Sequence, residues 1–218
     1  MNLAYQIRKT RINLSMNNWL ILINAAFFII CTILILTKII PLNYIALKPS
    51  NIFQGKYLWT FLTSMFMHGG IFHLFVNMLS LFFIGGLIEK ILGSKRYLLF
   101  YLSSGLFAGL FFALSSFIFS GELNAYAVGS SGAIFGLIGI LMLLTPNLSV
   151  YVMFIPIPIK MKYAAPGMLI VLWIISITAN VGIGNTAHLG GLLAGLIYGF
   201  YLTKKFPNKT KLIRRNFS

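Results

Sequence analysis

Long apolar stretches separated by short polar connections dominate the sequence. A helix that crosses a bilayer core about 30 Å thick needs roughly 20 apolar residues. Six stretches approach or reach that length, at residues 19–40, 71–88, 97–119, 131–144, 164–178 and 186–202. The pattern therefore predicts an all-α membrane protein, built as a bundle of six transmembrane helices.

The connections between these stretches differ in character. Residues 41–70 are too long for a tight turn and rich in aromatic side chains, so we expect them to lie partly in the membrane interface. Residues 155–163 (IPIPIKMKY) are predicted to form a loop, because two prolines oppose a helix. No small-residue cleavage site follows the first stretch, which favours a retained span over a signal peptide.

We expect a single membrane domain over residues 1–218. It comprises a cytoplasmic N-terminal segment (1–18), a six-span core (19–202) and a basic cytoplasmic tail (203–218). Composition agrees with a membrane protein, since 59% of residues are hydrophobic and 9% charged, against about 25% charged in soluble domains.

The net charge of +15 raises the question of nucleic acid. The basic residues form short clusters between apolar runs, a placement typical of membrane topology and of contact with anionic lipid, so no nucleic-acid partner is expected. Of the 17 lysines and arginines, all but Lys38, Lys48 and Lys56 fall at the N-terminus, in the second and fourth connections or in the tail. The positive-inside rule then predicts that both termini are cytoplasmic.

This topology brings several polar side chains to one depth. The second, fourth and sixth spans all begin near the outer face, and they begin with His73 and Asn77, with Ser131 and with His188. His73 and Asn77 are four residues apart and share a helix face. Polar groups inside a membrane are costly and are therefore candidates for a functional site.

Nucleophilic catalysis fits this set of groups. A serine hydroxyl needs a base to remove its proton, and an imidazole titrates near working pH, so Ser131 and His188 are the candidate nucleophile and base. The oxyanion formed in acyl transfer needs hydrogen-bond donors, which His73, Asn77 and the backbone N–H of Ser131 could supply.

The acidic residues exclude an aspartate triad, because the sequence has no aspartate and only two glutamates. Glu89 lies at the far end of the second span, whereas the sequence leaves open where Glu122 lies relative to His188. We therefore expect a Ser–His dyad, with Phe135 as the ring against which His188 packs.

Glycines flank the candidate site. Gly129 and Gly132 surround the serine, and the last span carries Gly191 and Gly195. Small residues let transmembrane backbones approach closely. Residues 131–144 span only about 21 Å as a helix, so Ser131 is expected below the outer surface, in a water-filled cavity.

Three motifs together resemble the rhomboid family of intramembrane serine proteases. They are G-x-S-G at residues 129–132, H-x-x-x-N at 73–77 and A-H-x-x-G-x-x-x-G at 187–195, in the order that the family has them. G-x-S-G alone is a weak signal, but the three in register are specific. The resemblance covers about residues 55–202. Where many members have Trp-Arg in the first loop, this chain has Trp59 and Thr60.

The resemblance implies a fold and an activity. It implies a six-helix bundle with a wet site open to the outer face, Ser131 as nucleophile, His188 as base, and His73 and Asn77 as oxyanion donors. It further implies cleavage of single-span transmembrane substrates near their outer boundary, with lateral entry near the second and fifth spans under a mobile loop at 179–185.

The expected partners are single-span substrates and membrane lipids, with no cofactor and no metal. One chain holds all the candidate catalytic residues, so a monomer suffices for catalysis, and the oligomeric state stays open.

Composition rich in Lys, Asn and Ile indicates a bacterial chain. For such a chain we expect the plasma membrane and a site facing outward.

Other interpretations compete with a protease. A zinc site using His68, His73 and His188 would lack a carboxylate and leave the Gly-Ser turn unexplained. A non-catalytic rhomboid-like protein that binds or chaperones membrane clients would be expected to lose Ser131 or His188, and both are present. A transporter would show repeated spans and charges at mid-membrane.

Two further polar residues lie close to the motifs. No role is assigned to His68, and Ser130 is expected to position the backbone.

Overall fold

The computed structural model describes residues 14–152, 156–179 and 181–217, and these residues are mostly helical. The α-helices are α1 (Met16–Leu36), α2 (Pro49–Phe53), α3 (Thr60–Thr63), α4 (Ile71–Ser80), α5 (Gly86–Leu92), α6 (Ser94–Ser115), α7 (Ser131–Leu144), α8 (Met161–Thr178), α9 (Asn185–Lys205) and α10 (Pro207–Asn216). Shorter elements are η1 (Leu42–Tyr44), the π-helical turn η2 (Leu81–Gly85), η3 (Ser120–Glu122), and the paired strands β1 (Ser149–Val150) and β2 (Ile159–Lys160).

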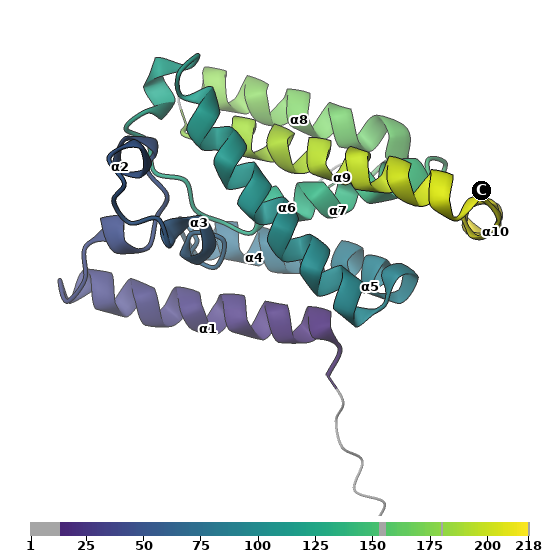
Figure 1. The fold of residues 1–218 in the computed structure, drawn as a ribbon, viewed down its shortest axis with the longest axis horizontal. Helices are drawn as coiled ribbons and strands as arrows, with labels where there is room; N and C mark the ends of the chain where they lie inside the picture. The colour runs from purple at the N-terminus through teal and green to yellow at the C-terminus, as the bar shows by residue number, and fades with distance from the viewer. Residues whose placement is uncertain (1–13, 153–155, 180, 218) are drawn as a thin grey trace, which may run out of the picture.

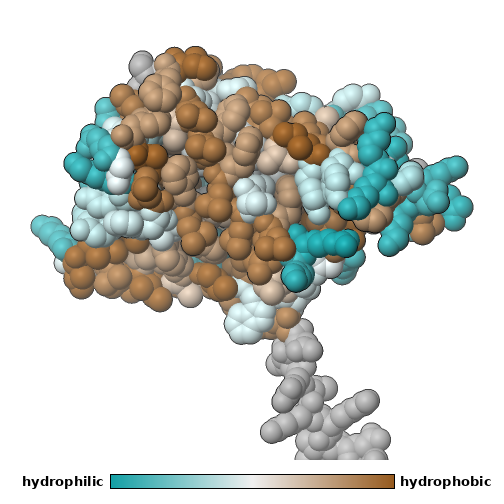
Figure 2. Space-filling model, viewed as in Figure 1, coloured by the Kyte–Doolittle hydropathy of each residue, from teal (hydrophilic) through white to brown (hydrophobic). Residues whose placement is uncertain are grey.

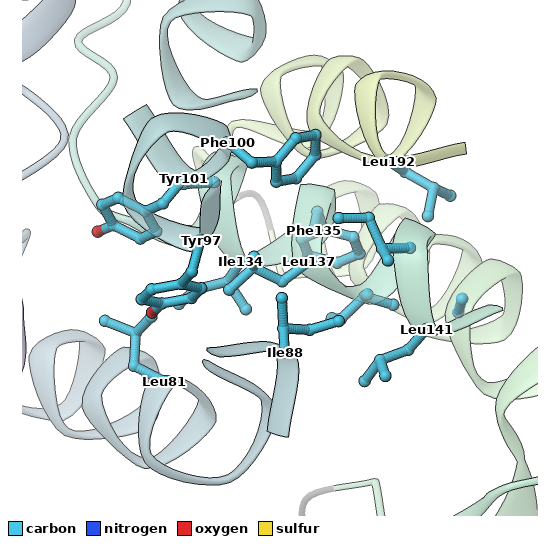
Figure 3. Close-up of a cluster of buried hydrophobic side chains, with 14 of the residues drawn as sticks. Leu81, Ile88, Tyr97, Phe100, Tyr101, Ile134, Phe135, Leu137, Leu141 and Leu192 are labelled. Carbon is cyan, nitrogen blue, oxygen red and sulfur yellow. The ribbon is translucent and has the colours of Figure 1, made fainter. Parts of the chain in front are cut away.

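The long helices run roughly along one axis and surround α7 (Figure 1). Every residue of α7 from Gly132 to Leu141 is buried, and the helix packs mainly against α9 and α6. Figure 3 shows the core around it, where Tyr97 and Tyr101 of α6 lie beside Ile134 and Leu137 of α7. The short apolar helix is therefore the centre of the bundle.

The outer surface of the bundle is apolar. Apolar side chains cover the middle of the molecule, and hydrophilic ones gather at its two ends (Figure 2). Within the described residues, four helices have the length and hydropathy to cross a membrane: α1, the continuous helix Ile71–Leu92, α6 and α8. α7 is apolar but shorter. The chain is thus a multi-pass membrane protein.

The helix bounds differ from the predicted stretches mostly at their ends. The fourth stretch matches α7 at residues 131–144. The first helix starts at Met16 and ends at Leu36, because the chain turns at Lys38, whose φ is +61°. α6 covers residues 94–115 and not 97–119, because it begins directly after the turn at Gly93, whose φ is +80°.

Two connecting segments contain structure that the apolar pattern misses. The predicted loop at 155–163 contributes β2 and the first residues of α8, while residue 155 lies outside the described residues. The basic tail forms the helix α10, because Pro207 at its first turn starts a new helix after Phe206. Of the predicted loop at 179–185, residue 179 and residues 181–184 have no regular structure, Asn185 already begins α9, and residue 180 lies outside the described residues.

A buried polar cluster ties α1 to the end of the second span. The side-chain amide of Asn17 donates to the Leu81 carbonyl in the π-turn (2.8 Å) and accepts from the Tyr97 hydroxyl (2.6 Å). The Glu89 carboxylate accepts from the first two backbone N–H groups of α1 (2.9 Å each) and from the Ser94 hydroxyl (2.6 Å). Glu89 therefore caps α1, a structural role at the end of the bundle opposite Ser131.

Candidate active site

The turn that carries Ser131 is held by the first loop. Leu47 and Ala127 exchange two backbone hydrogen bonds (3.1 and 2.8 Å), and the Gly129 N–H donates to the Ser64 carbonyl (2.9 Å). Gly129 has φ +121°, and a Cβ there would lie 2.9 Å from the His73 ring. Only glycine suits both the left-handed backbone and the space. The turn thus delivers Ser131 as the first residue of α7.

Ser131 and His188 meet across the interface of α7 and α9. The Nε2 atom of His188 lies 2.7 Å from the Ser131 hydroxyl oxygen, within hydrogen-bond distance. The imidazole stacks on Phe135, one turn further along α7, with ring centroids 4.6 Å apart and planes 19° apart. His188 is only 7% exposed, whereas Ser131 is half-buried. The serine side of the pair is therefore the more accessible one.

No carboxylate stands behind the imidazole. The two oxygens of Glu122 accept from the hydroxyls of Ser115 (2.6 Å) and Thr186 (2.8 Å). The Nδ1 atom of His188 has no hydrogen-bond partner among the described residues. For Nε2 to accept the serine proton, Nδ1 must carry the ring hydrogen. The geometry is that of a serine–histidine pair without an acid.

His73 presents a hydrogen-bond donor beside the serine. Its Nδ1 accepts the backbone N–H of Gly69 (3.2 Å), which leaves the hydrogen of a neutral ring on Nε2. That edge of the ring faces Gly129, since both Cε1 and Nε2 lie within 3.0 Å of where a Gly129 Cβ would be. The same Cβ position is 3.6 Å from the Ser131 oxygen. An N–H donor therefore stands next to the candidate nucleophile.

Asn77 lies one turn below His73 and is buried. Its amide nitrogen donates to the His73 carbonyl (2.9 Å), which uses one of its two hydrogens. The second hydrogen remains for another acceptor. The structure places Asn77 on the site's side of α4 but binds its amide to its own helix.

The close approach of α7 and α9 depends on glycine. A Cβ at Gly191 would collide with the carbonyl of Gly132, and one at Gly195 with the carbonyl of Gly136. Larger residues at these positions would separate the two helices. The glycines thus bring the Ser131 and His188 side chains, which are short, within reach of each other.

His68 lies behind the site and not in it. It is 1% exposed, its ring is edge-on to His73 with centroids 5.3 Å apart, and neither nitrogen has a hydrogen-bond partner of ordinary geometry among the described residues. Burial, and to a lesser extent His73, lowers the pKa of His68 to about 4, so the ring is neutral. With Thr32, Met67 and Tyr126 it lines a cavity of about 340 Å³ between α1 and the loops.

Ser130 faces the opposite way from Ser131. It is fully buried at the start of α7, and its side chain lies beside Tyr101 of α6. Its neighbour alone points toward His188. Among the residues that the structure describes, no three His, Cys, Asp or Glu side chains gather as metal ligands would.

Comparison with known proteins identifies the family. The family model for the rhomboid domain matches residues 55–205. The chain belongs to the rhomboid family. The extent of the match agrees with the resemblance predicted over about residues 55–202, and the family assignment is confirmed.

Relatives of this rhomboid chain occur in plants and bacteria. RHOMBOID-like protein 1 of Arabidopsis thaliana is 38% identical over 71% of this chain and 37% of its own length. Rhomboid protease GluP of Bacillus subtilis is 37% identical over 69% of this chain and 27% of its own length. Inactive RHOMBOID-like protein 8 of Arabidopsis thaliana is 34% identical over 65% of this chain and 37% of its own length.

The matched region therefore spans well under half of each of these three relatives. One of these relatives is named a protease and another is named inactive. Family membership alone leaves the activity of this chain to be argued from its own residues.

The structural roles of two polar residues, one near the site and one at the opposite end of the bundle, escape prediction from the sequence. Glu122 ties the end of α6 to the start of α9 through Ser115 and Thr186, and so fixes the turn before His188. Asn17 bonds the π-turn in the second span. The only sequence signal for this hydrogen bond is the position of Asn17, a polar residue near the start of an apolar stretch.

Proposed function

We propose that this protein is an intramembrane serine endopeptidase that uses Ser131 and His188 as a dyad. The observation that carries the proposal is the 2.7 Å separation of the Ser131 oxygen and His188 Nε2. A serine hydroxyl becomes a nucleophile when a base within hydrogen-bond reach takes its proton. The alignment of the imidazole by Phe135 and the nearby His73 donor support the same assignment.

Acylation follows from these positions. His188 Nε2 takes the Ser131 proton while the oxygen attacks the scissile carbonyl carbon. The resulting oxyanion accepts from the Nε2–H of His73, from the backbone N–H of Ser131 and from the second amide hydrogen of Asn77. As the C–N bond breaks, His188 returns the proton to the leaving amine, and an ester of Ser131 remains.

Deacylation runs the same path with water. His188 removes a proton from a water molecule, whose oxygen attacks the ester carbonyl. The tetrahedral oxyanion uses the same donors, the ester C–O bond breaks, and the proton on His188 passes to the Ser131 oxygen. Because Nδ1 of His188 has no acid partner among the described residues, Phe135 must hold the ring through both steps.

The proposed substrates are single-span transmembrane proteins, cut near the outer face of the membrane. In this proposal α7 and α9 complete six spans with the four long helices, both termini are cytoplasmic, and the basic end of the bundle faces the cytosol. The membrane is the bacterial plasma membrane. Substrates enter laterally near the second and fifth spans, and no cofactor or metal takes part.

Mutation of the two residues tests the activity. Ser131→Ala and His188→Ala are each expected to abolish cleavage of a single-span reporter by the purified full chain in detergent. Labelling of the protein by a serine-reactive fluorophosphonate measures the nucleophile directly. We expect labelling of the wild type and none of Ser131→Ala.

The neighbouring serine provides the matched control. Ser130→Ala removes a hydroxyl from the same turn that does not touch His188, so cleavage and labelling should persist. Full cleavage by Ser131→Ala would refute the mechanism. Wild-type protein that neither cleaves the reporter nor takes the label would favour the alternative of a non-catalytic protein that binds membrane clients.

A further inference from the structure

One end of the bundle carries a large excess of positive charge. The ends of α5, α7 and α9 and the starts of α6 and α8 meet there, together with α10, and hydrophilic side chains cover it (Figures 1 and 2). Its described cations are Lys90, Lys95, Arg96, Lys160, Lys162, Lys204, Lys205, Lys209, Lys211, Arg214 and Arg215. The one glutamate at this end, Glu89, directs its oxygens to α1 and Ser94.

The helix α10 lies across this end. In Figure 1 it is seen end-on while α9 runs across the view, so the two helices are roughly perpendicular. Thr210 and Ile213 face the bundle, whereas Lys209 and Lys211 are exposed. The Arg214 guanidinium donates to the Leu143 carbonyl at the end of α7 (2.8 Å). A basic helix held perpendicular to the spans is placed as a membrane-surface helix would be.

A groove opens between α10 and the connection from α5 to α6. It has a volume of about 90 Å³ and an apolar floor, with Arg96 and Lys209 on its walls and the buried Thr210 in its lining. The apolar lining residues are Ile91, Leu92, Leu144, Leu202, Phe206 and Ile213. The Lys209 ammonium lies 5.8 Å from the centre of the Phe206 ring, a cation–π distance that positions it at the groove.

We propose that this groove binds one anionic phospholipid. Its phosphate lies between the Arg96 guanidinium and the Lys209 ammonium, and its acyl chains run over the partly exposed Ile91 and Leu92 onto the apolar side of the bundle. Arg96 and Lys209 have no carboxylate partner among the described residues, so they attract an anion, and the apolar floor next to them selects an anion that carries hydrocarbon. The proposal does not depend on the proposed protease activity.

The experiment compares lipids bound to the purified full chain. Delipidated protein in phosphatidylcholine micelles is titrated with phosphatidylglycerol of the same acyl chains, and native mass spectrometry counts the retained lipid. We expect one phosphatidylglycerol per wild-type chain. Arg96→Gln with Lys209→Gln should weaken its retention about tenfold or more, because both cations that attract the phosphate are lost.

The matched control removes equal charge at the other end. Lys38→Gln with Lys56→Gln changes two exposed lysines outside the groove, and retention should stay as in the wild type. Equal losses in both pairs would show diffuse charge attraction only and overturn the site. Equal retention by the Arg96 and Lys209 pair would also overturn it.

Two further arms complete the test. Glycerol phosphate has the phosphate without acyl chains, so it should not displace the lipid at matched concentration; displacement would identify a site for free phosphate and overturn the lipid proposal. Arg96→Lys with Lys209→Arg keeps the charges and should restore retention. If the double glutamine variant fails to fold, lipid retention is compared between the wild type and Lys209→Gln alone, which changes an exposed side chain of α10 and should also weaken retention.

Discussion

The imidazole of His188 is oriented by packing and not by a carboxylate. Stacking on Phe135 and one hydrogen bond to Ser131 define its position, and Glu122 is occupied elsewhere. A stacked ring pair is worth about 0.5–1.5 kcal/mol, enough to favour one ring orientation. In a membrane interior this avoids the cost of a buried charged acid beside the site.

The role proposed for His73 can be tested separately from that of the dyad. His73→Ala removes one donor to the oxyanion, so kcat for reporter cleavage should fall about 100-fold or more while KM changes little. Phe75→Ala on the exposed face of the same helix is the control and should leave kcat within about twofold. An unchanged kcat in His73→Ala would remove His73 from the mechanism.

His68 predicts an acid-sensitive fold. Its pKa of about 4 in the folded protein lies below the ordinary value of 6.5, so the unfolded chain binds a proton more readily. Stability should therefore fall as pH drops from 6.5 to 4, by up to about 3 kcal/mol. Thermal unfolding in detergent measures this, and His68→Phe should reduce the dependence; an equally steep fall in that variant would exclude His68 as its source.

At the level of elements, the contact between α7 and α9 brings the candidate dyad together. Ser131 and His188 begin neighbouring helices whose backbones touch at Gly132 and Gly191. In the second span, a polar side chain has the corresponding structural role. Asn17 donates a hydrogen bond to the π-turn, which lies below His73 and Asn77. Polar side chains thus organise the bundle at its ends, and small residues organise its centre.

A glycine substitution tests the helix contact. Gly191→Ala should destabilise the fold by about 1–3 kcal/mol and sharply lower activity, because the new Cβ would meet the Gly132 carbonyl. Gly167→Ala in α8 adds the same methyl where no atom lies within 4 Å, and should be neutral or slightly stabilising. Thermal unfolding and reporter cleavage are measured for both variants. If Gly191→Ala behaves like Gly167→Ala, the contact between α7 and α9 tolerates an added methyl group.

At the scale of the whole molecule, charge and hydropathy both vary along the long direction of the bundle. Apolar surface covers the middle of the bundle, and the basic residues gather at the end that carries α10 (Figure 2). The positive-inside rule predicts that this end lies in the cytosol and the Ser131 end outside, which is the orientation that we propose.

Cysteine labelling tests the orientation in intact bacterial cells. Cys31 is buried and is first replaced by Ala. A membrane-impermeant maleimide should then label Gly121→Cys, in the exposed loop before the serine, but not Lys95→Cys at the basic end until the cells are opened. The reverse pattern would invert the topology.

The sequence alone determines the family, the order of the helices and the bounds of α7, because apolar runs partition into lipid wherever they occur in a fold. The three motifs already select Ser131, His188, His73 and Asn77 as the residues to examine. Their pairing at 2.7 Å joins side chains 57 positions apart and depends on how closely two backbones approach.

Only the tertiary structure decides where the remaining polar groups act. Glu122 could have stood behind His188, and the fold instead binds it to Ser115 and Thr186. The basic tail could have been an extended chain, and it is a helix across the end of the bundle with a groove beneath it. These outcomes depend on which surfaces meet after the spans assemble, and a one-dimensional pattern of hydrophobicity does not contain that information.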